Sequence, residues 1–378
     1  MLNDFLGFTA TFASLSTAHD VTVLIPTICR EDQYDDFRLC LRSCLAIKPH
    51  EIRVSTIESD LLRITKLAHS IDPRIQVIAA SFANKRQQIY EAILRITTPI
   101  TILANDDIKL PSESLPHILA PFENSKIDAV GTCQRVRRRP GLGIIDQIWQ
   151  YLGECCIERR NFEISATSHM DGRISCLSGR TAGIRTKILQ TQDFMTGYVT
   201  ETWLGIPLNA DDDNFVTRLL VAKGWGIRIQ MCKKAEVLTT LDFGCGFLKQ
   251  CLRWARSNWR SNTKRIIFEW RVWILYALLL ATLSHSLITD PLLSFLLHCS
   301  TITWDPSHRL LSFCIFALWL LFTKVVKLVP HFVLYPANIC FIPVTILFGY
   351  FHGPIKFYAL LTLHLTTWGS RKVHGKEE

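Results

Sequence analysis

The sequence predicts an α/β domain with a mainly parallel sheet, followed by an α-helical membrane region. From residue 20 to residue 104, short runs of β-branched and apolar residues alternate with amphipathic stretches at helical spacing. This alternation is typical of a parallel sheet with helices on both faces. From residue 272 the chain is almost continuously apolar, and several segments approach the roughly 20 residues that a helix needs to cross a bilayer.

The composition agrees with an aqueous domain joined to a membrane region. The 378 residues leave room for two domains, 48% of them are hydrophobic, and the formal net charge is +9. A basic excess favours anionic partners. Since no nucleic-acid-binding module accompanies it, we expect lipid headgroups and nucleotide phosphates, and no nucleic acid. The 13 cysteines are scattered and show no zinc-type spacing, so we expect reduced thiols.

The first half of the chain supplies the predicted sheet. Strands are expected at 21–25, 51–57, 75–79 and 100–104, and helices at 35–47, 61–70 and 84–96. The helix at 35–47 has an acidic start and a proline beyond its end, as helix termini prefer. Further strands are expected at 224–230 and 236–240, and a further helix at 145–164.

An acidic pair, Asp106 and Asp107, follows Asn105 at the end of the strand at 100–104. Ligands of parallel sheets bind at the carboxyl ends of the strands. Mg²⁺ and Mn²⁺ prefer one or two carboxylates plus substrate phosphates, although a plain Asp-rich turn has the same composition. Lys85 and Arg86, before the preceding helix, could supply cations for the same phosphates or form a solvated helix start.

A second acidic cluster, Asp211 to Asp213, precedes a helical apolar pattern. Crowding of three carboxylates could raise the pKa of one, which would suit a general base acting on a hydroxyl. Aspartate is also favoured at a helix N-terminus, and both interpretations can hold. The small residues at 178–183 suggest a loop pressed against a ligand or a tight turn. The arginines between 135 and 139 are interpreted as a solvated face or a contact with anionic headgroups.

The stretch 247–260 contains Gln250, Arg253 and Trp254, which share one face of a helix at i, i+3 and i+4. Arginine pairs with phosphate oxygens, and an indole stacks on apolar sugar faces. The alternative is an interfacial helix anchored by its tryptophan and arginine. The motif lies where the soluble pattern gives way to the apolar one.

The membrane region is predicted at 272–370, with three or four spans. Its apolar segments are 272–289, 291–304, 310–323, 328–355 and 357–368. We expect a catalytic domain at 20–246, interfacial helices at 247–271 and a charged tail at 371–378. The segment 1–19 lacks the features of a signal peptide or a spanning helix. Basic residues flank both ends of the region, which places the tail and the domain in the cytosol and favours four crossings.

Taken together, these motifs resemble the membrane-embedded family 2 glycosyltransferases, namely cellulose, chitin and hyaluronan synthases. The closest likeness is to the hyaluronan-synthase-like fungal polysaccharide synthases, often called capsule-type. The likeness covers residues 20–265 and rests on the ordered segments VTVLIPT, NKR, the acidic pair, SGRTAGIR, NADDDNFVTR and QCLRWARSNWR. It implies a GT-A (Rossmann-like) catalytic domain, a UDP-sugar donor, Mn²⁺ or Mg²⁺, and a plasma-membrane location.

The resemblance also implies roles for individual residues. Asp106 and Asp107 match the metal and diphosphate motif, Asp213 matches the catalytic base with Asp212 beside it, and Lys85 matches a donor contact. Gln250, Arg253 and Trp254 match the motif that closes the donor and acceptor site. The chain departs from the family at Asn105, where a carboxylate is expected, and at 55–58, which lacks the usual aspartates near the uracil.

We therefore predict a processive, inverting glycosyltransferase that extends a β-linked polysaccharide from a UDP-sugar and extrudes it through the membrane. A transferase that glycosylates a lipid and a catalytically weakened relative are the alternatives, and Asn105 favours the second. Relatives of this kind usually carry spanning helices ahead of the catalytic domain, so a shortened form or an incomplete gene is also expected.

Overall fold

The computed structural model describes residues 20–170, 174–268 and 286–366. The predictions for 1–19 and 371–378, and most of the span expected at 272–289, lie outside the described residues. The chain divides into two compact units. One lies within Met1–Arg137, Glu163–Thr240 and His364–Glu378, and the other within Arg138–Phe162 and Leu241–Leu363.

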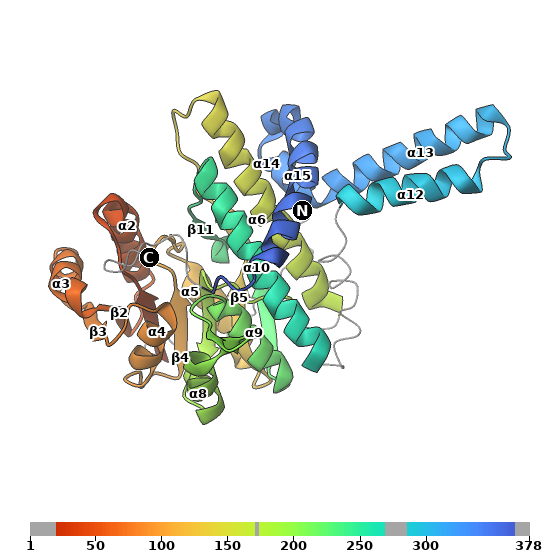
Figure 1. The fold of residues 1–378 in the computed structure, drawn as a ribbon. Coiled ribbons are helices and arrows are strands. Elements are labelled where there is room, and N and C mark those ends of the chain that lie inside the picture. The colour runs from red at the N-terminus through yellow and green to blue at the C-terminus, as the bar shows by residue number, and fades with distance from the viewer. Residues whose placement is uncertain (1–19, 171–173, 269–285, 367–378) are drawn as a thin grey trace. The chain divides into compact units, whose positions relative to one another are not determined.

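The first unit is built on a seven-stranded sheet in the order β10-β5-β7-β4-β1-β2-β3 (Figure 1). Its strands are β1 (Val21–Pro26), β2 (Glu51–Ile57), β3 (Gln76–Ala80), β4 (Ile100–Ala104), β5 (Ile127–Thr132), β7 (Thr181–Arg185) and β10 (Gly226–Gln230). β7 is antiparallel to both its neighbours, β4 and β5, whereas the other pairs are parallel. The predicted α/β class with a mainly parallel sheet is confirmed.

Helices cover both faces of this sheet because its strands are apolar on both sides. In β1, Val21, Val23 and Ile25 belong to one core, and Leu24 belongs to the other. The first core includes side chains of α2 (Tyr34–Ala46), α3 (Leu61–His69) and α5 (Ser114–Leu119). The second includes side chains of α4 (Lys85–Ile93), α7 (Thr186–Leu189), α8 (Gln192–Thr200) and α9 (Asp212–Ala222).

Two small sheets complete the first unit. β6 (Gln134–Val136) pairs in parallel with β11 (Val237–Thr239), and β8 (Thr202–Trp203) forms a hairpin with β9 (Ile206–Pro207). Short 3₁₀ turns lie at Glu31–Gln33, Glu58–Asp60, Ala120–Glu123 and Lys233–Ala235. The β8–β9 hairpin connects α8 to the second acidic cluster, so its conformation bears on the position of that cluster.

Two expectations need correction. The small residues expected to form a loop at 178–183 enter β7 at Thr181, because their backbone groups pair with β4 and β5 on both sides. The arginine run is a solvated face only in part: Arg138 and Arg139 are exposed, whereas Arg135 and Arg137 are half-buried. Arg135 pairs with Glu236 at 2.7 Å, Arg137 pairs with Asp36, and Arg138 pairs with Glu154 at 2.6 Å.

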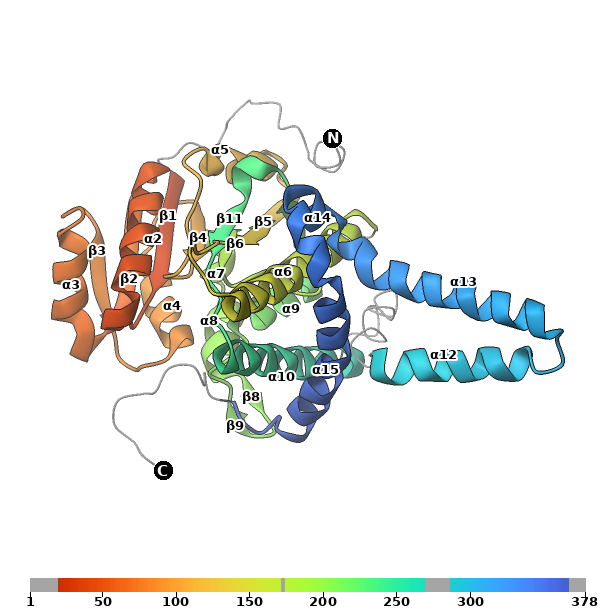
Figure 2. The same ribbon diagram turned by 90° about the horizontal axis from the view of Figure 1, so that it is seen from above.

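The second unit is helical. It contains the N-terminal part of α6 (Ile144–Met170) with α10 (Cys245–Phe268), α12 (Ser286–Ser300), α13 (Pro306–Val325), α14 (Val329–Leu334) and α15 (Ile342–Leu361). Two 3₁₀ turns, Val326–Leu328 and Pro336–Phe341, flank α14. Tyr151, Cys155, Leu328 and Phe332 form a small apolar core between α6 and the α14 region. α12 and α13 run side by side in both views (Figures 1 and 2).

Two stretches of the second unit are long and apolar enough to cross a membrane among the described residues: Pro306–Leu334 and Pro336–Leu361. Large apolar side chains on α12 and α13 are exposed, including Leu292, Phe295, Leu296, Leu311, Leu318 and Phe322. Pro306–Leu334 and Pro336–Leu361 therefore have the length and composition of membrane-spanning helices.

Candidate active site

A pocket opens at the carboxyl ends of β1 and β4 in the first unit. Its charged and polar lining comes from α4, the turn after β4, the loop before β7 and the start of α9. The lining residues include Pro26, Lys85, Asn105, Ser178, Gly179, Tyr198, Asp212 and Asp213. All of these residues except Tyr198 come from segments that the sequence motifs had singled out.

Lys85 reaches into this pocket from the first turn of α4. Asn84 caps the helix by accepting a hydrogen bond from the backbone N–H of Arg86 at 2.9 Å. The Lys85 ammonium pairs with Asp212 Oδ2 at 2.8 Å and donates to Asn105 Oδ1 at 3.1 Å. The residue that replaces the expected carboxylate therefore serves as an acceptor for Lys85.

The second acidic cluster forms the N-terminus of α9, as one interpretation predicted. Asp211 adopts the left-handed conformation (φ 62°), and its carbonyl accepts the first helical hydrogen bond from Phe215 at 3.0 Å. Asp213 accepts from the backbone N–H of Asn214 at 2.8 Å and from that of Gly179 at 3.4 Å. The turn thus aims two carboxylates, Asp212 and Asp213, toward the pocket.

The loop before β7 approaches this turn closely at Gly179. A Cβ at that position would lie 3.2 Å from Asp213 Cβ, so only glycine fits without displacing the aspartate. Two interpretations of Gly179 were possible from the sequence, a loop pressed against a ligand or a tight turn. In the structure its close neighbour is the acidic turn.

The pKa of Asp212 moves in the direction opposite to that expected for a base in a crowded acidic cluster. Burial raises it, but the attraction and hydrogen bond of Lys85, with a smaller contribution from Arg86, outweigh burial and lower the pKa below its ordinary value. Asp212 is therefore a permanent carboxylate that holds Lys85. The pKa of Tyr198 in the pocket wall is raised well above its usual value by burial, so its phenol stays neutral.

Asp106 and Asp107 follow β4, and threonine hydroxyls hold both of them. Thr27 donates to Asp106 Oδ2 at 2.6 Å, and Thr240 donates to Asp107 Oδ2 at 3.2 Å. Two adjacent hard oxygen donors fit Mg²⁺ or Mn²⁺ bound jointly with substrate phosphates. No group of three or more His, Cys, Asp or Glu side chains with metal-binding geometry occurs among the described residues, so the phosphates would complete such a site.

Arg86 takes a place different from the one expected of a donor-binding residue. It is only 1% exposed, and its guanidinium donates to the carbonyls of Tyr198 and Ala210 and pairs with Glu201. The sequence did not single out Glu201 or Thr27, since neither carries a recognisable spacing signal. Both act through backbone or side-chain contacts that only the fold brings together.

Gln250, Arg253 and Trp254 lie on α10 in the second unit, and all three are partly buried. Gln250 Oε1 is buried with no hydrogen-bond partner among the described residues. α10 is anchored along α15: Trp259 donates to the carbonyl of Lys356 at 3.0 Å, and Arg256 donates to Thr362 Oγ1 at 2.9 Å. The predicted helix and its shared face are present.

Comparison with known proteins identifies the family. The family described as glycosyltransferase like family 2 matches residues 19–257, which span the first unit's described sheet and the start of α10. The chain belongs to this family. It is 50% identical over 366 residues to a type 2 glycosyltransferase of Pyricularia oryzae, covering 94% of this chain and 74% of that protein. As a family 2 glycosyltransferase, it is an enzyme that transfers a sugar.

More distant similarities agree with this assignment. Hyaluronan synthase 1 of Xenopus laevis is 24% identical over 314 residues, covering 79% of this glycosyltransferase but 49% of the synthase. A mannosyltransferase of Pyrobaculum calidifontis, solved with GDP-Man and Mn²⁺, superposes with a TM-score of 0.53 at 13% identity, covering 92% of this chain and 87% of that one. The latter likeness confirms the GT-A type of fold.

Proposed function

We propose that this glycosyltransferase is an inverting, metal-dependent enzyme that transfers sugar from a UDP-sugar to a growing β-linked polysaccharide. The observation that carries the proposal is the pocket in which Lys85, Asn105, Asp212 and Asp213 converge at the carboxyl ends of β1 and β4. A cation and carboxylates that line one pocket suit a leaving diphosphate and a reacting hydroxyl.

In the proposed reaction, Asp213 accepts the proton of the acceptor hydroxyl. The hydroxyl oxygen bonds to the anomeric carbon as the bond from that carbon to the diphosphate breaks, so the configuration inverts and UDP leaves. Lys85, held by Asp212 and Asn105, offsets negative charge on the departing diphosphate. A divalent cation on Asp106 and Asp107 would neutralise further diphosphate charge.

The C-terminal unit would provide a further ligand-binding face and the membrane contact. The partly buried face of Gln250, Arg253 and Trp254 offers an amide, a guanidinium and an indole, and the buried Oε1 of Gln250 remains available for a ligand donor. The apolar helices would anchor the enzyme in a membrane, proposed to be the plasma membrane with the catalytic unit in the cytosol. They would also carry the polymer across it.

The test is nucleotide release from purified enzyme in detergent. UDP-glucose, UDP-N-acetylglucosamine and UDP-glucuronate are offered separately with Mn²⁺ or Mg²⁺. GDP-mannose is an added arm because the mannosyltransferase of similar fold was solved with GDP-Man and Mn²⁺. We expect release with one UDP-sugar, dependence on the metal, and loss of at least 100-fold in Asp213→Asn, as expected for removal of a general base.

The matched control is Asp193→Asn, the same change at an exposed carboxylate on α8 that pairs with Lys223. This variant should release nucleotide at the wild-type rate. Full release by Asp213→Asn would reject Asp213 as the base. A product that stays at one added sugar on a lipid would reject processive synthesis, and folded enzyme that releases nothing from any donor would reject the proposed activity.

A further inference from the structure

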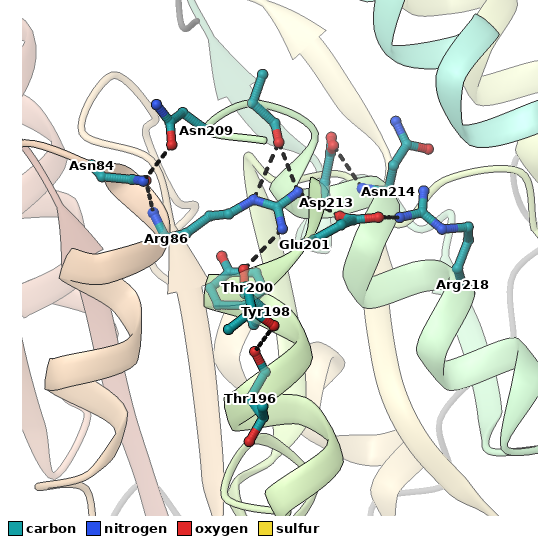
Figure 3. Close-up of polar contacts among 11 residues, drawn as sticks. Asn84, Arg86, Thr196, Tyr198, Thr200, Glu201, Asn209, Asp213, Asn214 and Arg218 are labelled. Atoms are coloured by element: carbon teal, nitrogen blue, oxygen red, sulfur yellow. Dashed lines mark hydrogen bonds and ion pairs between the residues drawn. The ribbon is translucent and has the colours of Figure 1, made fainter. Parts of the chain in front are cut away.

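The buried guanidinium of Arg86 makes its hydrogen bonds to groups of the first unit. Its Nε donates to the carbonyl of Ala210 at 3.2 Å, one terminal nitrogen donates to the carbonyl of Tyr198 at 2.9 Å, and the other donates to Ala210 at 2.7 Å and to Glu201 at 2.9 Å (Figure 3). A guanidinium has five N–H groups, and four contacts of this kind leave little for a substrate phosphate.

The Glu201 carboxylate neutralises two buried cations, Arg86 and Arg218. Its two carboxylate oxygens divide between Arg86 and Arg218, at 2.9 and 2.5 Å. All three side chains are at most 10% exposed. Buried ions need such pairing because burying an unpaired charge away from water costs several kcal/mol of folding free energy. The guanidinium also lies over the rings of Tyr198 and Phe215, with centroids at 5.3 and 5.6 Å.

These contacts converge on the segment that leads into the acidic turn. The carbonyl of Ala210 directly precedes Asp211, whose left-handed backbone begins α9. A second link from the same helix start joins Asn84 to Asn209, with 2.8 Å between the amide nitrogen and the amide oxygen (Figure 3). A non-glycine residue in the left-handed region persists where surrounding contacts fix it, and Arg86 supplies two of those contacts.

We propose that Arg86, together with its partner Glu201, is a positioning residue that fixes the acidic turn so that Asp213 faces the acceptor hydroxyl. This inference rests on the proposed role of Asp213 as the base. Arg86 acts through the Ala210 carbonyl and makes no contact with the donor. Since Lys85 directly precedes Arg86 on α4, the same clamp sets the distance between the Lys85 ammonium and Asp213.

Lysine cannot replace Arg86 in this role. A lysine ammonium is a point donor, whereas the planar guanidinium reaches Ala210 from two nitrogens and Tyr198 and Glu201 at once. Arg86→Lys keeps the charge but loses the fixed geometry. A misplacement of about 1 Å at a reacting group costs on the order of 100-fold in rate. We therefore expect kcat to fall roughly 10- to 100-fold, while the Kd for UDP stays within twofold of wild type.

The experiment measures kcat, the donor KM and the Kd for UDP in Arg86→Lys and Glu201→Gln, with hydrogen exchange of the backbone as a readout that needs no turnover. Exchange should accelerate in peptides covering 201–215 in both variants. Glu201→Gln leaves both bonds to Ala210 in place, so its kcat should fall less than that of Arg86→Lys. This second variant keeps the test decisive if Arg86→Lys does not fold.

The matched control is Arg185→Lys. Arg185 also donates to buried carbonyls, those of Ile127 and Phe122 at 3.0 and 2.8 Å, and it lies beside the carboxylate of Asp128 at 3.7 Å. This variant should lose stability and keep kcat, because its contacts lie at the opposite end of β7 from the acidic turn.

A rise in the Kd for UDP that matches the loss of kcat/KM in Arg86→Lys would overturn the inference and make Arg86 a donor contact. Unchanged kcat or unchanged exchange at 201–215 would also overturn it. Asp213→Asn that retains full turnover would instead reject the proposed base, whatever Arg86 does. If wild-type enzyme turns over none of the donors, accelerated exchange confined to the acidic turn supports the clamp and unchanged exchange rejects it.

Discussion

The Lys85 ammonium lies 2.8 Å from the Asp212 carboxylate and joins the first turn of α4 to the first turn of α9. Both side chains are nearly buried, at 13% and 11% exposed. Salt screens such a pair little. The pair therefore holds the starts of α4 and α9 together in the wall of the pocket.

Lys85→Met should reduce both activity and stability, the latter by about 3 kcal/mol at pH 7, because it leaves a buried carboxylate without its cation. In wild-type enzyme the pKa of Asp212 is depressed, so this group contributes stability above its unfolded pKa of about 3.9, and that stability is lost as the pH falls through the folded pKa. In the variant, burial should raise the pKa of Asp212 above its unfolded value. The pH dependence of stability then reverses, so that stability is lost as the pH rises.

Thermal unfolding between pH 4 and pH 8 checks this reversal. The stability gap between Lys85→Met and wild type should widen with rising pH. Lys223→Met, which removes an exposed partner of Asp193, should show a small gap at every pH. A constant gap for Lys85→Met would contradict the expected rise in the pKa of Asp212 and show that Lys85 is not needed to keep it ionised.

Gly179→Ala should lower kcat by roughly tenfold or more, because the new methyl group would push Asp213 by a few tenths of an ångström out of place. Stability should change little, since the loop is otherwise unaltered. The comparison is Gly143→Ala, whose added Cβ would meet nothing within 4 Å. Equal kcat values for the two variants would show that the close approach at Gly179 is not required for turnover.

Asn105→Asp should lower the Mn²⁺ concentration needed for half-maximal nucleotide release by several-fold. It adds a third hard oxygen donor with negative charge beside Asp106 and Asp107, which a divalent cation favours. A metal titration of initial rates measures the change, and Asn124→Asp, at an exposed position, is the control. A higher Mn²⁺ requirement would mean that the new carboxylate is taken up by Lys85.

Asp290→Asn should strongly destabilise the C-terminal helices. Asp290 Oδ2 accepts from Lys324 at 2.6 Å and from the Tyr350 hydroxyl at 2.7 Å, which ties α12, α13 and α15 together. Removing one charge leaves a buried ammonium, at a cost of about 3 kcal/mol or more. The double variant with Asp290→Leu and Lys324→Leu should be less destabilised than Asp290→Asn, as thermal unfolding in detergent would measure. The reverse order would make the ion pair itself the main source of stability.

The sequence predicted the sheet-forming segments of the first half because each is a short apolar run bounded by turn residues. It did not predict β7, because Ser178 to Gly183 has the composition of a turn and pairs only through neighbours distant in the chain. It did not predict β5 as a strand for the same reason: both its partners, β7 and β10, come later.

The residues of the candidate site also divide into those that the sequence indicated and those that only the fold revealed. Lys85, Asp212 and Asp213 were recognisable because each lies at a helix start beside a charged cluster. The place of Arg86 could not be predicted, because a basic residue at a helix start is equally compatible with solvent, substrate or a buried carboxylate. Glu201, which decides among these, lies on a different element, and no local spacing links the two.

The position of β5 also affects how the chain folds during synthesis. β1 to β4 can pair in turn as they leave the ribosome, whereas β5 (Ile127–Thr132) has no strand partner until β7 is made and no second one until β10 follows. At roughly 5 to 20 residues per second, an apolar strand with open edges therefore waits for several seconds. Such an edge is a site of aggregation, so expression should depend on rapid translation or on chaperone protection while residues 132 to 230 are made.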